Sequence, residues 1–199
     1  MSVPDFDTLN ASNIVDFIGD IFLRRGAESY LGEDVTMSEH MLQGAFLAEQ
    51  AGAEDTLIVA ALLHDIGHYT NEFEEDAAQE GRDNYHETAG ARVLEPYFPK
   101  IVTDCVLYHV PAKRYLCATD PEYFGQLSEA SVQTLKLQGG PMSAGEVAEL
   151  DKNPNLQAIL QVRRWDDGGK VKDKTTPDFD HYAPMLRRVV RAYARSKNQ

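Results

Sequence analysis

The run Ala60-Ala61-Leu62-Leu63-His64-Asp65-Ile66-Gly67-His68 places a histidine beside an aspartate at the end of the most apolar segment of the chain. Water solvates both side chains well, so burying them costs free energy unless a partner compensates. Imidazole and carboxylate groups are ligands for first-row metals such as iron, manganese and zinc. The run therefore predicts a metal site at the end of a buried helix.

Outward from this run, the chain shows helical periodicity and no convincing alternating strand. Apolar residues at helical spacing predict a first helix from Ile14 that ends at Gly26. Capping patterns and breakers predict further helices over 36–52, 56–66, 86–95, 99–111 and 155–165, a C-terminal helix around 185–193, and shorter ones opened by Pro121, Ser128 and Ser143. Without a repeat or a linker, residues 1–199 are expected to form one all-α domain.

Composition excludes several classes of protein. The 199 residues carry a formal net charge of -13, whereas nucleic-acid binding needs a basic surface. The same charge would repel anionic membranes, and no apolar run approaches the ~20 residues that span a bilayer. The N-terminal residues lack the features of a signal peptide, and Cys105 and Cys117 match no disulfide framework or zinc motif. We expect a soluble, cytoplasmic protein with two reduced cysteines.

Five of the six histidines lie within residues 40–109. Asp166 shares a helix face with Ile159 and Val162, so its carboxylate is expected to point inward. Four imidazoles and two carboxylates exceed what one tetrahedral zinc ion needs, so two metals bridged by Asp65 fit the set better. The candidate ligands are His40, His64, Asp65, His86, His109 and Asp166, with His68 as a support for a ligand and His181 at the surface.

The order of one His, a His-Asp pair, two further His and a distant Asp resembles the HD-domain superfamily, mostly metal-dependent phosphohydrolases. The fourth histidine and three segments are similar to its small branch of mixed-valent di-iron oxygenases that cleave carbon–phosphorus bonds. These segments are Tyr30-Leu31-Gly32-Glu33, His109-Val110-Pro111-Ala112-Lys113-Arg114-Tyr115-Leu116 and Gln138-Gly139-Gly140-Pro141-Met142. The resemblance spans roughly residues 14–182 and implies a single HD-type helical bundle.

The resemblance also implies a ligand set for two irons, one Fe(II) and one Fe(III). One iron would be held by His40, His64, Asp65 and Asp166, and the other by Asp65, His86 and His109. Tyr30 would occupy a coordination position until substrate displaces it, with Glu33 assisting that exchange. Both would act in catalysis together with Lys113.

A phosphonate substrate would need cationic contacts inside this acidic chain. The basic pairs Lys113-Arg114 and Arg163-Arg164 lie close to the candidate ligands His109 and Asp166, and such pairs create a locally positive pocket. We expect Lys113 and Arg163 to contact substrate, and Arg114 and Arg164 to be solvated charges at helix ends. The resemblance implies the substrate contacts Tyr30, Glu33, Lys113, Ser131, Gln138 and Arg163.

The implied reaction uses O₂ to convert 1-hydroxy-2-(trimethylammonio)ethylphosphonate to glycine betaine and phosphate. One alternative is the same reaction on 2-amino-1-hydroxyethylphosphonate, giving glycine. A second is a metal-dependent phosphohydrolase, in which the metals activate water. Chemistry of the inositol-oxygenase type would not require the basic pairs, and a non-catalytic metal-binding domain is the fourth possibility. The sequence does not set the N-methylation of the substrate, the oligomeric state or the resting oxidation states.

Overall fold

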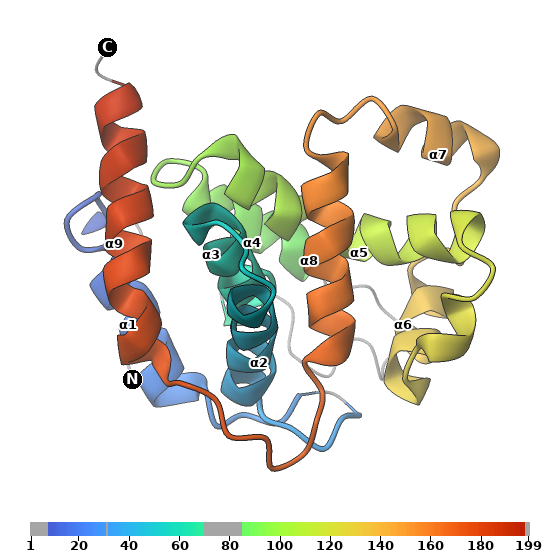
Figure 1. Cartoon of the computed structure of the whole chain (residues 1–199), viewed down its shortest axis with the longest axis horizontal. Helices are drawn as coiled ribbons and strands as arrows, with labels where there is room; N and C mark the ends of the chain where they lie inside the picture. The colour runs from blue at the N-terminus through green and yellow to red at the C-terminus, as the bar shows by residue number, and fades with distance from the viewer. Residues whose placement is uncertain (1–7, 31, 70–84, 198–199) are drawn as a thin grey trace.

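The computed structural model describes residues 8–30, 32–69 and 85–197, which form a bundle of helices (Figure 1). Strand-like pairing in these ranges is limited to an isolated bridge between Ser29 and Thr36. The prediction of an all-α fold is therefore confirmed. The α-helices are α1 (Ile14–Arg25), α2 (Met37–Gln50), α3 (Asp55–Leu63), α4 (His86–Leu94), α5 (Lys100–Thr119), α6 (Glu129–Leu137), α7 (Ala144–Leu150), α8 (Leu156–Gly168) and α9 (Phe179–Ser196), with the 3-10 helices η2 (Ile66–Tyr69) and η4 (Phe124–Gln126).

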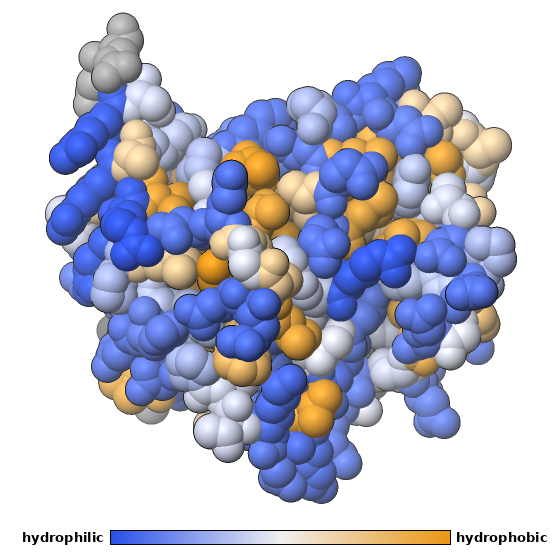
Figure 2. All heavy atoms as spheres, viewed as in Figure 1, coloured by the Kyte–Doolittle hydropathy of each residue, from blue (hydrophilic) through white to orange (hydrophobic). Residues whose placement is uncertain are grey.

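Helix α3 lies at the centre because it is apolar on every face. Its residues from Ile58 to Leu63 are all buried, and it packs against α2, α5, α8 and α9. Helices α1 and α9 lie together on one side of the bundle, and α6 and α7 lie beyond α8 on the other (Figure 1). The space-filling view shows mainly hydrophilic residues on one face, with apolar ones between them (Figure 2).

Several predicted helix ends are confirmed. The Thr36 side chain accepts a hydrogen bond from the Glu39 backbone N–H in a complete capping box, and Ser143 forms the same motif with Glu146. Helix α1 ends at Gly26. The sequence pattern Asn84-x-x-Glu87 also predicts a cap for α4, but Asn84 lies outside the described residues. These caps satisfy backbone N–H groups that would otherwise lack partners at the start of each helix.

Three predicted boundaries were wrong. Helix α5 continues through Pro111 to Thr119, although proline usually ends or kinks a helix. Helix α3 ends at Leu63 rather than at Ile66, and η2 follows it. The segment after Pro121 forms turns and the short η4 instead of an α-helix. In α5, burial of Ala112 and Leu116 beyond the proline offsets the lost hydrogen bond, since one large apolar side chain contributes about 1.5–3 kcal/mol.

Cys105 and Cys117 are both free thiols. Within the described ranges, no helix combines the length and the apolar character needed to cross a bilayer.

Candidate metal centre

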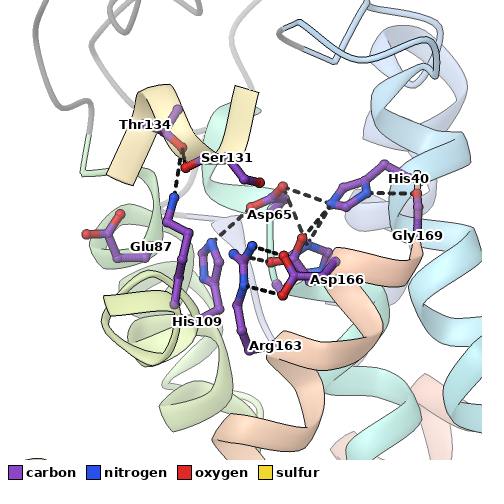
Figure 3. A network of polar contacts seen from close by, with 12 residues as sticks. His40, Asp65, Glu87, His109, Ser131, Thr134, Arg163, Asp166 and Gly169 are labelled. Carbon is purple, nitrogen blue, oxygen red and sulfur yellow. Dashed lines mark hydrogen bonds and ion pairs between the residues drawn. The ribbon is translucent and has the colours of Figure 1, made fainter. Parts of the chain in front are cut away.

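Five separate parts of the bundle bring the predicted ligand residues to one point. His40 comes from the first turns of α2, His64 and Asp65 from the turn after α3, and the other three residues from α4, α5 and α8. None of the six is more than 7% exposed. The six converging residues are His40, His64, Asp65, His86, His109 and Asp166, of which Figure 3 labels four.

Each carboxylate oxygen of Asp65 faces one pair of imidazoles. Its Oδ2 atom lies 3.3 Å from Nε2 of His40 and 3.4 Å from Nε2 of His64. Its Oδ1 atom lies 3.2 Å from Nε2 of His86 and 3.1 Å from Nε2 of His109. This arrangement is the one expected of a carboxylate that bridges two metal ions.

Hydrogen bonds to backbone carbonyls fix the orientation of three of these imidazoles. The Nδ1 atoms of His40, His64 and His109 lie 3.0, 2.8 and 2.7 Å from the carbonyl oxygens of Gly169, Ala61 and Val106. A carbonyl oxygen only accepts, so Nδ1 carries the proton and the Nε2 lone pair points at the centre. This is the tautomer that a metal-binding histidine requires.

The spacing of the Nε2 atoms requires a cation in each pair. Nε2 of His40 lies 2.9 Å from Nε2 of His64, and Nε2 of His86 lies 3.0 Å from that of His109. Two lone pairs at this distance repel each other unless a proton or a metal lies between them. The Asp65 and Asp166 carboxylates accordingly raise the pKa of His64 to about 10, against the opposing effect of burial.

Two buried carboxylate oxygens also lack a hydrogen-bond partner among the described residues, namely Oδ2 of Asp65 and Oδ1 of Asp166. The Asp166 Oδ1 atom lies 3.3 Å from Nε2 of His40 and 3.7 Å from Nε2 of His64. A buried carboxylate oxygen without a partner lowers the stability of the folded state. A metal between them would satisfy both, so the donor set fits a pair of metal ions.

Arg163 holds the other oxygen of Asp166. Its Nη1 donates to Asp166 Oδ2 over 2.6 Å (Figure 3). Its Nη2 donates to Asp167, and its Nε lies 3.1 Å from the hydroxyl oxygen of Tyr123. All three guanidinium nitrogens therefore have partners. This buried cation lowers the pKa of the Asp166 carboxyl well below its usual range, although burial alone would raise it, and it leaves Oδ1 directed at the histidines.

A pocket opens beside the candidate metal centre, on the side of His86 and His109, and all six predicted substrate contacts line it. The lining includes Asp65, His86, His109 and Asp166 from the candidate metal centre. The substrate contacts in its wall are Tyr30, Glu33, Lys113, Ser131, Gln138 and Arg163.

Lys113 is 3% exposed, and its Nζ donates to Thr134 Oγ1 over 2.8 Å. Burial, and secondly the positive charge of Arg163, lower the pKa of Lys113 to about 7. Its neighbour Arg114 instead pairs with Glu146 on the outside. Arg164 likewise pairs with exposed Asp120, 3.0 Å away, so one cation of each basic pair lines the pocket, as expected.

Tyr30 and Glu33 enter the pocket from the segment between α1 and α2. The Tyr30 ring stacks on the His40 imidazole, with ring centroids 4.1 Å apart. Burial and the nearby carboxylates of Asp65 and Asp166 raise the pKa of the Tyr30 hydroxyl well above its usual range. The Glu33 carboxylate accepts a hydrogen bond of 2.5 Å from Ser128 Oγ.

His68, expected to support a ligand, stacks on the His86 ring at a centroid distance of 4.0 Å. Its Nε2 lies 3.9 Å from Asp65 Oδ1, so it could also join a metal group with Asp65 and His86. The shorter His109–Asp65 distance of 3.1 Å makes His109 the better fourth imidazole.

Sequence reasoning missed several polar residues of the pocket and its surroundings. Glu87 is buried beside His86, with its Oε2 3.6 Å from Nδ1 of that histidine. Helix-capping patterns marked Ser128 and Glu87, but no functional motif marked any of these residues, although Lys170 directly follows the glycine pair after Asp166. The missed residues are Glu87, Tyr123, Ser128, Thr134, Asp167 and Lys170.

Histidines and aspartates in this order on a helical bundle define a metal-binding HD domain. The family model for the HD domain matches residues 37–159, and the chain belongs to this family. One relative is the [1-hydroxy-2-(trimethylamino)ethyl]phosphonate dioxygenase (glycine-betaine-forming) of Leisingera caerulea, 63% identical over 190 residues that cover 96% of this chain and 97% of the relative. The resemblance inferred from the sequence is thereby confirmed.

Two further relatives are more distant. The hydroxymethylphosphonate dioxygenase of Gimesia maris is 47% identical over 156 residues, which cover 78% of each chain. An uncharacterised protein of Acanthamoeba polyphaga mimivirus is 37% identical over 175 residues, covering 86% of this chain and 80% of that protein.

Proposed function

We propose that this protein is a cytoplasmic di-iron dioxygenase that cleaves the carbon–phosphorus bond of 1-hydroxy-2-(trimethylammonio)ethylphosphonate. The observation that carries the proposal is Asp65, whose two oxygens each face a histidine pair, in a chain 63% identical to a dioxygenase of this substrate. One O₂ and the substrate account for all atoms of glycine betaine, phosphate and one released proton.

The ligand assignment is part of the proposal. His40, His64, Asp65 and Asp166 would hold one iron, and Asp65, His86 and His109 would hold the other. Mixed carboxylate and imidazole donors suit iron, and fewer than six protein ligands per metal leave positions for O₂ and substrate. When bound, the mixed-valent iron pair would supply O₂ activation and Lewis acidity. The Tyr30 hydroxyl, which lies near the Asp65 carboxylate, would hold a coordination position until substrate displaces it.

The phosphonate would bind at Lys113. Three lysine and arginine side chains line the pocket in the described ranges, and two of them have acidic partners: Arg163 pairs with Asp166 and Asp167, and Lys170 pairs with Glu33. Lys113 has a hydroxyl partner instead, so its charge is the one available to a substrate anion.

Three other predicted contacts take separate roles. Ser131 forms part of the pocket wall beside Thr134. The Gln138 amide oxygen is buried and unpartnered among the described residues, so it can accept a hydrogen bond from the substrate hydroxyl. Arg163, with every nitrogen engaged, mainly positions Asp166. The Arg163 side chain lines the pocket, so its contact with substrate would be made from the pocket wall.

The cationic end of the substrate would bind at Tyr30 and Glu33. A carboxylate next to an aromatic ring is a good site for a quaternary ammonium group. One relative is named a hydroxymethylphosphonate dioxygenase. Hydroxymethylphosphonate has no quaternary ammonium group, so it is a necessary comparison substrate.

The experiment is a phosphate-release assay on iron-loaded enzyme with the trimethylammonio, amino and hydroxymethyl phosphonates, each with and without O₂. We expect equal amounts of phosphate and glycine betaine from the first substrate, only in the presence of O₂, and two irons per chain by elemental analysis. Phosphate release from a phosphate ester without O₂, supported by manganese, would instead identify a phosphohydrolase. A single tightly bound zinc would contradict the di-iron centre.

A further inference from the structure

Lys170 is a pocket residue whose backbone is fixed by the metal centre. It follows Gly169, whose carbonyl oxygen lies 3.0 Å from Nδ1 of His40. A Cβ atom at Gly169 would lie 3.0 Å from the His40 carbonyl oxygen and 3.3 Å from the Gly44 nitrogen. This close contact with α2 leaves the Lys170 backbone little freedom, so its side chain enters the pocket from a defined point.

The Lys170 ammonium lies between a carboxylate and an aromatic ring. Its Nζ is 3.3 Å from Glu33 Oε1 and 5.7 Å from the centroid of the Tyr30 ring. It also donates to Ser131 Oγ over 2.8 Å, and the Lys170 side chain is only 10% exposed. A cation held by an aromatic face and a carboxylate is the environment that recognises a quaternary ammonium ligand.

We propose that Lys170 is a specificity-determining residue that occupies the cation subsite, formed by Glu33 and Tyr30, until the cationic end of the substrate displaces it. The inference rests on the proposed function and names how its substrate is selected. A zwitterion can exchange partners with the Lys170–Glu33 ion pair. Its cation replaces Lys170 at Glu33, and the released ammonium can keep its hydrogen bond to Ser131.

A substrate without a cationic group cannot make this exchange. Hydroxymethylphosphonate would bind beside an intact Lys170–Glu33 pair, with Lys170 neutralising Glu33 near the substrate anion. Loss of the Lys170 charge should therefore affect the two kinds of substrate in opposite directions. A lysine that only stabilised the fold would affect both equally.

The first experiment uses tetramethylammonium ion, which isolates the cation subsite, with calorimetry on the metal-loaded enzyme. We expect Lys170→Met to bind this ion at least about fivefold more tightly than the unmodified protein, because the Glu33 carboxylate no longer has an internal counter-ion. Lys170→Arg should keep the original affinity. Lys170→Gln, which can still donate to Ser131, serves if the methionine variant does not fold. Unchanged or weaker binding in both neutral variants would overturn the proposal.

Lys172 provides the matched control. It lies two residues further along the same segment, and its Nζ pairs with exposed Asp34 at 3.5 Å. Lys172→Met removes the same charge outside the pocket, so tetramethylammonium affinity should stay as it was. An equal gain in Lys172→Met would show an effect of overall charge and would also overturn the proposal.

The second experiment compares turnover. In Lys170→Met, the ratio of kcat/KM for the trimethylammonio substrate to that for hydroxymethylphosphonate should rise at least about fivefold. A constant or lower ratio would count against the exchange. If the unmodified enzyme releases phosphate from neither substrate, the proposed function fails, while the tetramethylammonium measurement still decides whether Lys170 fills a cation subsite.

Discussion

At the scale of single residues, Asp65 is the point on which both halves of the candidate metal centre depend. We expect Asp65→Ala to lose both irons, since each oxygen faces its own histidine pair. Asp166→Ala should lose mainly the iron at His40 and His64, because Asp166 faces only that pair. Iron analysis of purified, folded variants measures both effects.

Asp104 is the control for this prediction. It is also a buried aspartate, but it pairs with Lys100 and Asn155 away from the metal centre. Asp104→Ala should therefore keep two irons, whatever it does to stability. Two irons retained in folded Asp65→Ala would contradict the bridging role.

Lys113 should give the reaction a pH dependence. With its pKa lowered to about 7, Lys113 loses its charge as the pH rises through 7, and the phosphonate loses its cationic partner. The value of kcat/KM, which reports on free enzyme, should fall above pH 7 by up to about tenfold per pH unit. Lys113→Met should lower kcat/KM about 10- to 100-fold at pH 6, as expected for a charged hydrogen bond, and should lack the decline.

Lys100→Met serves as the comparison, because it removes a lysine charge from the exposed start of the same helix, α5. This variant should keep the alkaline decline. A decline of the same size in Lys113→Met would assign it to another group, such as the substrate phosphonate itself.

Residue type explains which parts of the centre could be predicted. Buried histidines and aspartates carry metal chemistry in their identity, so His40, His64 and Asp65 stand out in the sequence. Lys170 and Ser128 do not, because their roles come from positions that only the packed helices define. The sequence likewise predicted Arg163 as a substrate contact but could not show that Asp166, Asp167 and Tyr123 already occupy its nitrogens.

At the scale of elements, the continuous helix α5 matters most. Because it runs through Pro111, His109 and Lys113 lie four residues apart on one face. If the helix ended at Pro111, the position of His109 would not determine which way the Lys113 side chain points. An internal proline destabilises a helix by about 3 kcal/mol, and this local effect led to the prediction that the helix ends there. The packing of α5 against α3, α4 and α8, which offsets that cost, is not visible in the local sequence.

The contact between η2 and α4 gives a prediction at this scale. A Cβ atom at Gly67 would lie 1.7 Å from the His86 carbonyl oxygen, so Gly67→Ala must push α4 and His86 away from Asp65. We expect this variant to lose the iron at His86 and His109 preferentially, and to lose about 1–3 kcal/mol of stability, as is typical of overpacking. Iron content and denaturant unfolding measure the two effects.

Gly125→Ala is the matched control, since a Cβ atom there would meet no atom within 4 Å. It should keep two irons and the original stability. Full iron content in Gly67→Ala would mean that η2 and α4 do not position the second iron.

At the scale of the whole molecule, the centre joins α2, α4, α5, α8 and the turn after α3, so metal binding and folding should be coupled. The metals would also neutralise buried carboxylates in a chain of net charge -13. A metal at a thousand times its dissociation constant stabilises the folded state by about 4 kcal/mol. In a chain of about 200 residues this corresponds to a Tm change of roughly 8–16 °C.

Removing iron with a chelator should therefore lower the Tm of this protein by roughly 10 °C, and adding iron back should restore it. Differential scanning calorimetry measures the shift. Asp65→Ala, which lacks the metals, should have a Tm that the chelator does not change. The Asp104→Ala variant should respond to the chelator like the unmodified protein, because its centre is intact. Equal Tm values for loaded and chelated protein would mean that the metals do not bind the folded state in preference to the unfolded one, and would contradict the coupling of metal binding to folding.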